Sequence, residues 1–412
     1  MPREMKDSDI EWIGEIPKEW IYCKLKNYFE FEKGKNAAIY TQEYIGEHFG
    51  EFPVYSGQTE NDGVMGKIDS YDYNITKCLF TTTVGAKVMT PKILKGKFSL
   101  SQNCLIMKPI EDSCIEFFYY ALLPLFDYKK SLIPSYMQPS LRIEDLKTYG
   151  FYIPTKTEQI KIADFLDKKC AEIDFVIAET KNTIEEYKKL KQSVITEAVT
   201  KGIRGPRPMK DSGIEWIGEI PTEWVVQKGK RILSIFDKPV KEDDGVITCF
   251  RDGEVTLRSN RREDGFTFAI QEIGYQGVDI GDLVVHGMDG FAGAIGISDS
   301  RGKASPVLNV MDSTENKRYI MYYLRNMAYN GIFIALATGI RVRSCDTNWN
   351  KLKELPYILP SKNEQKEIVD YIDNYCAEID SLIEKKTALL EELETYKKSL
   401  IYEYVTGKKE VF

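Results

Sequence analysis

This sequence contains a long internal repeat. Residues 5–20, MKDSDIEWIGEIPKEW, return as residues 209–224 with differences at only two positions. A repeat this long does not arise by chance, and it predicts two copies of one structural frame. A second pair of segments, 154–159 and 360–365, shares the pattern Pro-x-Lys-x-Glu-Gln. The frame therefore has a beginning and an end in each half of the chain.

The segments between the frames differ from one another. Residues 21–153 and 225–359 are similar in length but share little sequence. Constant frames around divergent inserts indicate that the frames perform one task twice, while the inserts perform related but different tasks. Duplication for symmetry alone explains the frames and leaves the divergence of the inserts unexplained.

Each frame ends in a predicted long helix. Thr155-x-x-Glu158 and Ser361-x-x-Glu364 form capping-box patterns, and Gly202 and Gly407 are placed to end the helices. Apolar residues recur at alternating steps of three and four, which indicates a coiled-coil seam. At about 38 residues, each helix would span roughly 55 Å. The seam positions are Ile173, Ile177, Ile184, Tyr187, Val194 and Ala198, and Ile379, Ile383, Leu390, Leu393, Leu400 and Tyr404.

These elements predict an α+β fold with a pseudo-two-fold internal repeat. We expect two mixed α/β domains separated by two long antiparallel helices that form a coiled coil and hold the domains apart. Helices that only mediate dimerisation are the alternative, and it is weakened because both copies lie in one chain. The linker between the halves is expected at 203–208, which is rich in Pro, Gly and Arg. The expected segments are 1–153 (first domain), 154–204 (first helix and linker), 205–358 (second domain) and 359–412 (second helix).

Charge is unevenly distributed along the chain. The net charge is −7, yet residues 73–110 hold six Lys and no acidic residue, and residues 316–345 hold five basic residues and no acidic residue. Basic stretches on nearly neutral inserts are the electrostatic footprint that contact with phosphates requires, although a solvated surface can look the same. The eight Cys are scattered without a CxxC pair, and only two His occur, so neither a disulfide framework nor a metal site is expected. No apolar run is long enough to span a membrane and no signal peptide is recognisable, so a cytoplasmic location is expected.

Candidate DNA contacts lie in polar, basic or aromatic loops of both inserts. Arg reads guanine bidentately and Asn or Gln reads adenine, whereas Lys mainly contacts the backbone. In the second insert, 258–262 is the strongest candidate, and His286 is as well suited to an ordinary core or surface role. The first insert contributes Tyr55, Ser56, Gln58, Lys87, Lys92, Ser101, Gln102, Asn103, Tyr136 and Gln138. The second contributes Arg251, Arg258, Asn260, Arg261, Arg262, His286, Arg301, Lys303, Arg341 and Arg343.

The frame motifs are those of a known family. The opening Lys-Asp-Ser-x-Ile-Glu-Trp-Ile-Gly-Glu-Ile-Pro of each half, and the Glu-Gln pair followed by Ala-Glu-Ile-Asp and a long helix, resemble the specificity subunits of Type I restriction-modification enzymes. The resemblance covers the whole chain. It implies that each insert reads one half of a split, asymmetric target in double-stranded DNA, and that the paired helices set the spacing between the halves. The inserts match the family in layout only, so no base-reading residue follows from it.

The resemblance also implies partners. The helices would bind two methyltransferase subunits, and a separate restriction and translocation subunit would join through the complex. S-adenosylmethionine, ATP and Mg are then expected on those partners, with no cofactor and no metal on this chain. Glu158, Gln159, Glu364 and Gln365, with the helices beyond them, are expected to belong to the partner-binding surface.

Motifs of catalysis are missing from the sequence. There is no Pro-Pro pair of the kind an adenine methyltransferase needs, and every Gly-Lys is followed by a residue other than Ser or Thr, which excludes a P-loop. We therefore expect no chemistry in this chain. The alternative function is a protein-protein scaffold with two interaction domains, which suits the acidic net charge but not the basic stretches.

Overall fold

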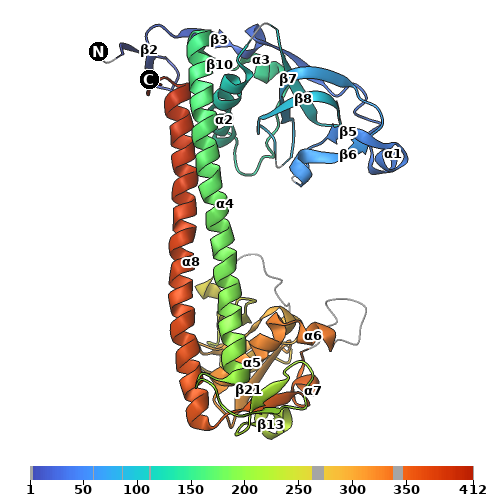
Figure 1. Cartoon of the computed structure of the whole chain (residues 1–412), viewed down its shortest axis with the longest axis vertical. Coiled ribbons are helices and arrows are strands. Elements are labelled where there is room, and N and C mark those ends of the chain that lie inside the picture. Colours follow the sequence, from blue (N-terminus) through green and yellow to red (C-terminus); the bar gives the residue numbers. More distant parts are fainter. Residues whose placement is uncertain are drawn as a thin grey trace. The chain divides into compact units, whose positions relative to one another are not determined.

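The computed structural model describes residues 3–58, 60–85, 87–110, 113–261, 273–336 and 347–411. Its contacts divide the chain into two units, which are described separately. Unit 1 comprises Met1–Thr180 and Ala388–Phe412, and unit 2 comprises Lys181–Thr387. The two long helices, α4 (Lys156–Lys201) and α8 (Lys362–Val405), are therefore shared, because each contributes one half to each unit (Figure 1). The sequence-based boundaries treated the helices as segments of their own, whereas the contacts assign each half to the domain on which it packs.

The core of unit 1 is a six-stranded sheet with the order β4-β9-β7-β8-β5-β6. β5 runs parallel to β8, and the other described neighbours are antiparallel. Helix α2 (Ile115–Ser131) buries Phe117 and Phe118 in one cluster with Phe29 and Leu79 of the sheet. The strands are β4 (Phe29–Lys33), β5 (Phe49–Tyr55), β6 (Val64–Ile68), β7 (Tyr73–Thr82), β8 (Lys92–Leu100) and β9 (Cys104–Pro109).

Shorter elements complete unit 1. Two antiparallel pairs, β1 with β2 and β3 with β10, connect the frame to the insert. The elements are β1 (Met5–Asp7), β2 (Glu15–Pro17), β3 (Ile21–Lys24), β10 (Gly150–Ile153), α1 (Gln42–Glu47), α3 (Ile143–Thr148), and the 3-10 turns η1 (Leu25–Asn27) and η2 (Asn61–Gly63).

Unit 2 has a smaller antiparallel sheet with the order β14-β21-β18-β19. Helix α5 (Lys317–Tyr329) buries Tyr319 and Tyr323 in one cluster with Leu283 and Met311 of this sheet. Most strands are three to six residues long: β11 (Met209–Asp211), β12 (Glu219–Pro221), β13 (Val225–Lys228), β14 (Leu233–Ile235), β15 (Ile247–Cys249), β16 (Val255–Leu257), β17 (Gln276–Val278), β18 (Leu283–His286), β19 (Ile295–Ile297), β20 (Gly302–Ala304), β21 (Leu308–Ser313) and β22 (Pro356–Leu359). The short helices are α6 (Ile332–Ala335), α7 (Trp349–Leu352), η3 (Gly229–Arg231), η4 (Arg258–Asn260) and η5 (Gly290–Ala292).

The frame repeat folds in the same way in both units. In the first hairpin Met5 pairs with Pro17, and in the second Met209 pairs with Pro221. One of the two sequence differences between the frames replaces Asp9 by Gly213, and both residues have a positive φ, 57° and 71°. Asp tolerates this conformation better than most residues and Gly adopts it without cost, so the turn geometry explains the exchange.

Within each unit the two helix halves pack antiparallel along the predicted seam. In unit 1, Ile173 and Ile177 of α4 join Leu400 of α8 in one buried cluster. Lys397 Nζ lies 2.6 Å from Asp174 Oδ2 and bridges the two helices. At 46 and 44 residues the helices are longer than the expected 38 or so, because they begin directly after the prolines and continue to the terminating glycines.

The glycines that follow the two long helices lie in close contact with residues of the frames. Gly202 and Gly407 have φ values of 79° and 72°. A Cβ atom on Gly407 would lie 2.4 Å from the Pro17 ring, and one on Gly202 would lie 2.0 Å from Arg207 Nη2. The end of α4 is thus packed against the second frame, and the end of α8 against the first.

Candidate nucleic-acid interface

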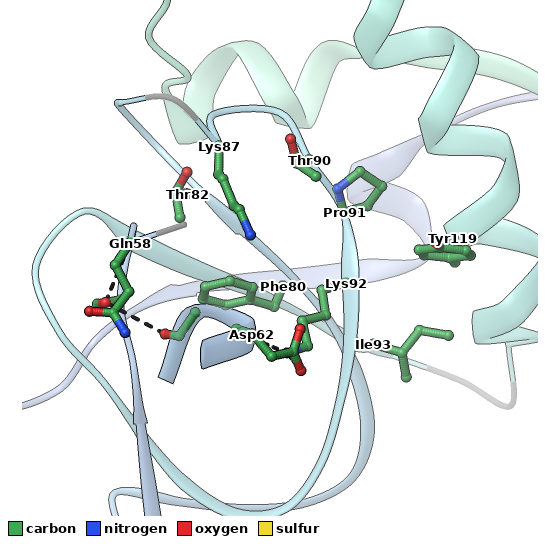
Figure 2. Close-up of a pocket in the computed structure, with 12 residues that line it drawn as sticks. Gln58, Asp62, Phe80, Thr82, Lys87, Thr90, Pro91, Lys92, Ile93 and Tyr119 are labelled. Atoms are coloured by element: carbon green, nitrogen blue, oxygen red, sulfur yellow. Dashed lines mark hydrogen bonds and ion pairs between the residues drawn. The ribbon is translucent and has the colours of Figure 1, made fainter. Parts of the chain in front are cut away.

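Unit 1 has a cavity of about 360 Å³ at one end of its sheet, hereafter the unit 1 cavity. Four of the residues predicted to contact DNA line it: Ser56, Gln58, Lys87 and Lys92. Ser56 and Gln58 follow β5, whereas Lys87 and Lys92 lie before and at the start of β8. The lining is completed by Asp62, Gly63, Phe80, Thr82, Thr90, Pro91, Ile93 and Tyr119, which the sequence did not single out. Figure 2 shows Lys87 extending into this cavity.

The polar groups of the unit 1 cavity are held by short-range contacts. Lys92 Nζ donates to the carboxylate and to the main-chain carbonyl of Asp62, and it lies 4.8 Å from the centroid of the Tyr55 ring. Gln58 Nε2 donates to Val64 O at 2.5 Å, which fixes the amide across the turn. Tyr55, another predicted contact, therefore lies beside a cation of this cavity.

The remaining candidates of unit 1 lie in loops at the same end of the sheet. Asn103 O accepts a hydrogen bond from Thr83 N, and Thr83 O accepts one from Leu141 N, both at 2.8 Å. These bonds join the turn containing Ser101, Gln102 and Asn103 and the loop containing Tyr136 and Gln138 to the end of β7. Tyr136 is 86% exposed. The structure thus places eight of the ten predicted residues of this unit at or beside the unit 1 cavity, and Tyr136 and Gln138 lie in the loop that precedes Leu141.

Unit 2 has a cavity of about 530 Å³, hereafter the unit 2 cavity. It brings together four predicted residues that are scattered in the sequence, Arg251, Arg258, Arg261 and His286. The other lining residues are Ile247, Thr248, Cys249, Phe250, Asp252, Asp289, Ser305, Val307 and Leu308. Asp252 and Asp289 lie next to turns, where acidic residues are common, so their sequence positions do not distinguish them from ordinary turn residues.

The arginines of the unit 2 cavity differ in their partners. Arg261 binds the carboxylates of Asp252 and Glu254 at 2.5 and 3.1 Å, and its guanidinium lies 4.2 Å from the centroid of the Phe250 ring. Arg251 Nη2 lies 2.8 Å from Asp289 Oδ1. The hydrogen bond with Asp252 is the main cause that raises the pKa of Arg261.

His286 has its tautomer set by the backbone. Its Nδ1 accepts hydrogen bonds from the main-chain N–H groups of Met288 and Asp289, at 3.2 and 3.0 Å. Burial lowers the pKa of the imidazole, so the neutral form is favoured. With Nδ1 as acceptor, the proton of the neutral ring is on Nε2, which makes His286 a hydrogen-bond donor toward a ligand.

Other candidates of unit 2 serve the fold. The Arg301 guanidinium binds Asp244 and Asp279, and Lys238 bridges Asp279 and Asp282. These contacts tie three loops together and leave Arg301 little capacity to read a base. Asn260 donates to Thr256 Oγ1, and Lys303 lies in β20. The predicted residues Arg262, Arg341 and Arg343 lie outside the described residues.

The four residues expected at the partner surface have partners inside the chain. Gln159 and Gln365 are buried and donate to the carbonyls of Pro154 and Pro360. Glu158 and Glu364 pair with Arg3 and Arg207, and Glu364 also accepts a hydrogen bond from Trp224 Nε1. The four side chains bind the frame to the start of each helix. Their polar groups are engaged within the chain and are therefore poorly placed to contact another protein.

The two arginines of these pairs were missed in the sequence. Arg3 and Arg207 are 204 residues apart, which is the offset of the frame, and each follows a proline. Extending the repeat upstream to Pro-Arg would have found them. Arg207 lies in the segment interpreted as a linker, yet its side chain is only 10% exposed, so this segment is anchored.

Exposed apolar side chains recur at matching positions of the long helices. In unit 1 these are Val176 and Tyr396, and in unit 2 they are Leu382 and Leu190. Val176 corresponds to Leu382, and Leu190 to Tyr396, at the helix offset of 206 residues. Each pair flanks an equivalent ion pair between the helices, Asp174–Lys397 in unit 1 and Asp380–Lys191 in unit 2. Both units therefore present the same apolar feature beside the same ion pair.

Comparison with known proteins identifies the family. Residues 17–186 match the family model of the Type I restriction modification DNA specificity domain. The type I specificity subunit relative S.MpnORF289P N-terminus of Mycoplasma pneumoniae is 32% identical over 148 residues, which are 35% of this chain and 74% of that relative. The chain belongs to the family of Type I specificity subunits.

Further relatives agree with this assignment. The specificity subunit of the type I restriction enzyme MpnII, also from Mycoplasma pneumoniae, is 31% identical over 157 residues, which are 36% of this chain and 44% of that protein. The matched stretch spans about half of the length of the first curated relatives.

A solved structure shares the fold of this Type I specificity subunit. A chain of a type I R-M system, determined in work on complex assembly and conformational transition, superposes with a TM-score of 0.66 at 13% identity. The superposition covers 96% of this chain and 99% of that chain. The predicted α+β class, with two mixed α/β domains and two long helices, is confirmed. None of the helices in the described part of the chain is long and apolar enough to cross a membrane.

Proposed function

We propose that this chain is the DNA sequence-specificity subunit of a Type I restriction-modification complex. Each unit reads one half of a two-part, asymmetric target in double-stranded DNA, and the chain itself performs no catalysis. The observation that carries this proposal is the pair of basic cavities, which differ in lining although the frame hairpins of the two units pair in the same register. A constant frame with two different reading surfaces suits recognition of two different sequences.

Both cavities offer the groups that DNA recognition requires. Lys87 and Lys92 supply cations for phosphates in unit 1, and Gln58 lies beside them. Arg251, Arg258 and His286 supply hydrogen-bond donors in unit 2. Phosphate contacts position a protein on the duplex, whereas donors and acceptors directed at base edges give specificity. A mixture of the two is therefore expected at each reading surface.

The partners follow from the repeat of the helices. The matching apolar pairs, Val176 with Tyr396 and Leu382 with Leu190, suit two copies of one partner protein. We assign these surfaces to two methyltransferase subunits, with restriction and translocation subunits joining through the complex. S-adenosylmethionine, ATP and Mg belong to those partners in this proposal, and the complex acts in the cytoplasm. The long helices set the gap between the half-sites.

A protein-protein scaffold is the second candidate. The exposed apolar positions on the helices favour it, because they would serve any protein partner. The two proposals differ in their dependence on salt. Phosphate contacts release counterions from the DNA, so binding through them weakens steeply as the salt concentration rises. Binding through an apolar protein interface does not show this dependence. Binding of the assembled complex to DNA that is absent, or unchanged between low and physiological salt, would favour the scaffold.

The decisive experiment maps adenine methylation in cells that express this chain with its methyltransferase partner. We expect methylation at one asymmetric, two-part sequence, and its complete loss when this chain is deleted. A matched control expresses the partner with unit 1 intact and the unit 2 insert replaced by that of another specificity subunit. One half of the methylated sequence should then change and the other remain. Methylation that persists without this chain contradicts the proposal.

A further inference from the structure

One arginine of the unit 2 cavity is placed to read a base. The Arg251 side chain is 65% exposed, and Nη2 forms an ion pair with Asp289 Oδ1 at 2.8 Å. No other hydrogen-bond acceptor contacts Arg251 among the described residues, and a guanidinium has five N–H donors. Most N–H donors of Arg251 are thus available to a ligand. The ion pair with Asp289 holds one edge of the planar guanidinium in place.

The neighbouring arginines are less suited to this task. Arg261 is held by two carboxylates and an aromatic ring. Arg258 donates from Nε to Thr248 Oγ1 at 3.4 Å and lies deeper in the wall. Although 258–262 was the strongest candidate in the sequence, the geometry favours Arg251.

The pairing with Asp289 selects among base pairs. In the major groove a G·C pair presents two adjacent acceptors, guanine N7 and O6, followed by the donor N4 of cytosine. An A·T pair places its donor between two acceptors. A bidentate arginine with a carboxylate at its side offers two donors followed by an acceptor, which matches G·C and does not match A·T.

His286 adds a third group to the same cavity. Its neutral ring carries the proton on Nε2, because Nδ1 accepts two main-chain hydrogen bonds. Asp289 belongs to the turn that holds this ring, since its N–H is one of the two donors. The arginine partner and the histidine are therefore positioned by one turn, 286–289.

We propose that the unit 2 cavity reads a G·C base pair in its half-site, with Arg251 donating to guanine N7 and O6 and Asp289 accepting from cytosine N4. His286 donates to a neighbouring acceptor on a base or phosphate. This inference rests on the proposed function, and it names the residue pair and the base pair that unit 2 recognises.

The test uses the full chain assembled with its methyltransferase partner, with methylated sites mapped for each variant. Arg251→Lys keeps the charge but loses the bidentate fork, so one G·C position of one half-site should become degenerate among the methylated sites. The preference for that base pair should fall about ten- to a hundredfold. Asp289→Ala should relax the same position, because it removes the acceptor for cytosine. Arg231→Gln is the matched control, since Arg231 is an exposed arginine of unit 2 outside the cavity.

The outcomes separate this inference from the proposed function. If the wild-type chain directs methylation to a two-part site but Arg251→Lys lowers it equally at every site, the G·C assignment is overturned and the proposed function stands. The same holds if the two variants relax different positions, or if the control relaxes the same one. If methylation does not depend on the chain at all, the proposed function fails first.

Discussion

The two units use the same frame but different cations. The unit 1 insert, residues 21–153, contains 14 Lys and a single Arg, whereas the unit 2 insert, residues 225–359, contains eight Lys and ten Arg. Lysine is a flexible point charge that suits phosphates, and arginine is a planar fork that suits guanine and carboxylates. The described arginines of unit 2 are largely paired with carboxylates, as in Arg301 with Asp244 and Asp279. Net charge alone therefore does not distinguish the two inserts, because it is nearly equal in both, whereas the ratio of lysine to arginine differs.

The frames also differ in one respect. Both contain an arginine that pairs with the glutamate at the start of a helix and lies over a tryptophan, Arg3 over Trp20 and Arg207 over Trp224. In unit 2, Trp224 Nε1 donates to the same glutamate, whereas Trp20 Nε1 has no hydrogen-bond partner among the described residues. The unit 2 version is therefore the more buried of the two, but Arg207 Nε and Glu364 Oε1 have no hydrogen-bond partner among the described residues, whereas Arg3 donates two hydrogen bonds to Glu158.

The largest expected effect concerns the helices that connect the two reading units. We predict that deleting residues 181–184 of α4 together with residues 387–390 of α8 abolishes methylation of the native target. One helical turn is about 5.4 Å, so a target whose gap is shorter by one or two base pairs should be methylated instead. Both half-sites should be unchanged. Mapping of methylated sites checks this, and an altered half-site with an unchanged gap would reject the spacer role.

The second prediction compares the two frame arginines. Arg207→Ala leaves the Glu364 carboxylate, which is 2% exposed, without its cation, so the free energy of unfolding should fall by about 3–5 kcal/mol. Arg3→Ala should cost less, because Glu158 is 24% exposed and water can solvate it. Chemical denaturation of the full chain, followed by tryptophan fluorescence, measures both. An equal loss in the two variants would show that burial does not distinguish the frames.

These pairs illustrate what the sequence could and could not predict. The repeat, the helix seam and the terminating glycines were predictable, because each is a pattern of local spacing. The partners of Arg301 were not, since Asp244 and Asp279 are 57 and 22 residues away and only the folded loops bring them together. The cavities were predicted in part: the cations, the amide of Gln58 and the ring of Tyr55 were predicted, but the carboxylates and the rings of Phe80 and Phe250 were not. Acidic residues near turns are too common for their spacing to indicate a binding role.

The third prediction sharpens the contrast between lysine and arginine. Lys87→Gln in the unit 1 cavity should weaken binding of the assembled complex to all duplexes alike, and should lower the slope of log affinity against log salt by about one. Arg251→Lys in unit 2 should leave this slope unchanged and alter only base preference. Titrations with the target and with an unrelated duplex at several salt concentrations measure both. Lys26→Gln, an exposed lysine of unit 1 outside the cavity, is the matched control.

The smallest effect concerns the charged network that unit 2 has around Arg301. Hydrogen bonds from Arg301 and Lys238 lower the pKa of Asp279 from 3.8 to about 2. A folded-state pKa below the unfolded value means that the carboxylate stabilises the fold above pH 4 or so, and that this contribution is lost as the pH falls toward 2. Asp279 is half exposed, so the contribution should be under about 1 kcal/mol.

Asp279→Asn therefore should be slightly less stable than the wild type at neutral pH, and the difference should vanish by about pH 2. Denaturation at a series of pH values checks the sign and the window, and Asp299→Asn serves as a control because Asp299 lies outside the network. A difference that grows on acidification would contradict the assignment. If the assignment holds, Arg301, which was predicted to contact DNA, has a structural role. Base recognition is then assigned to Arg251, whose guanidinium has a single carboxylate partner.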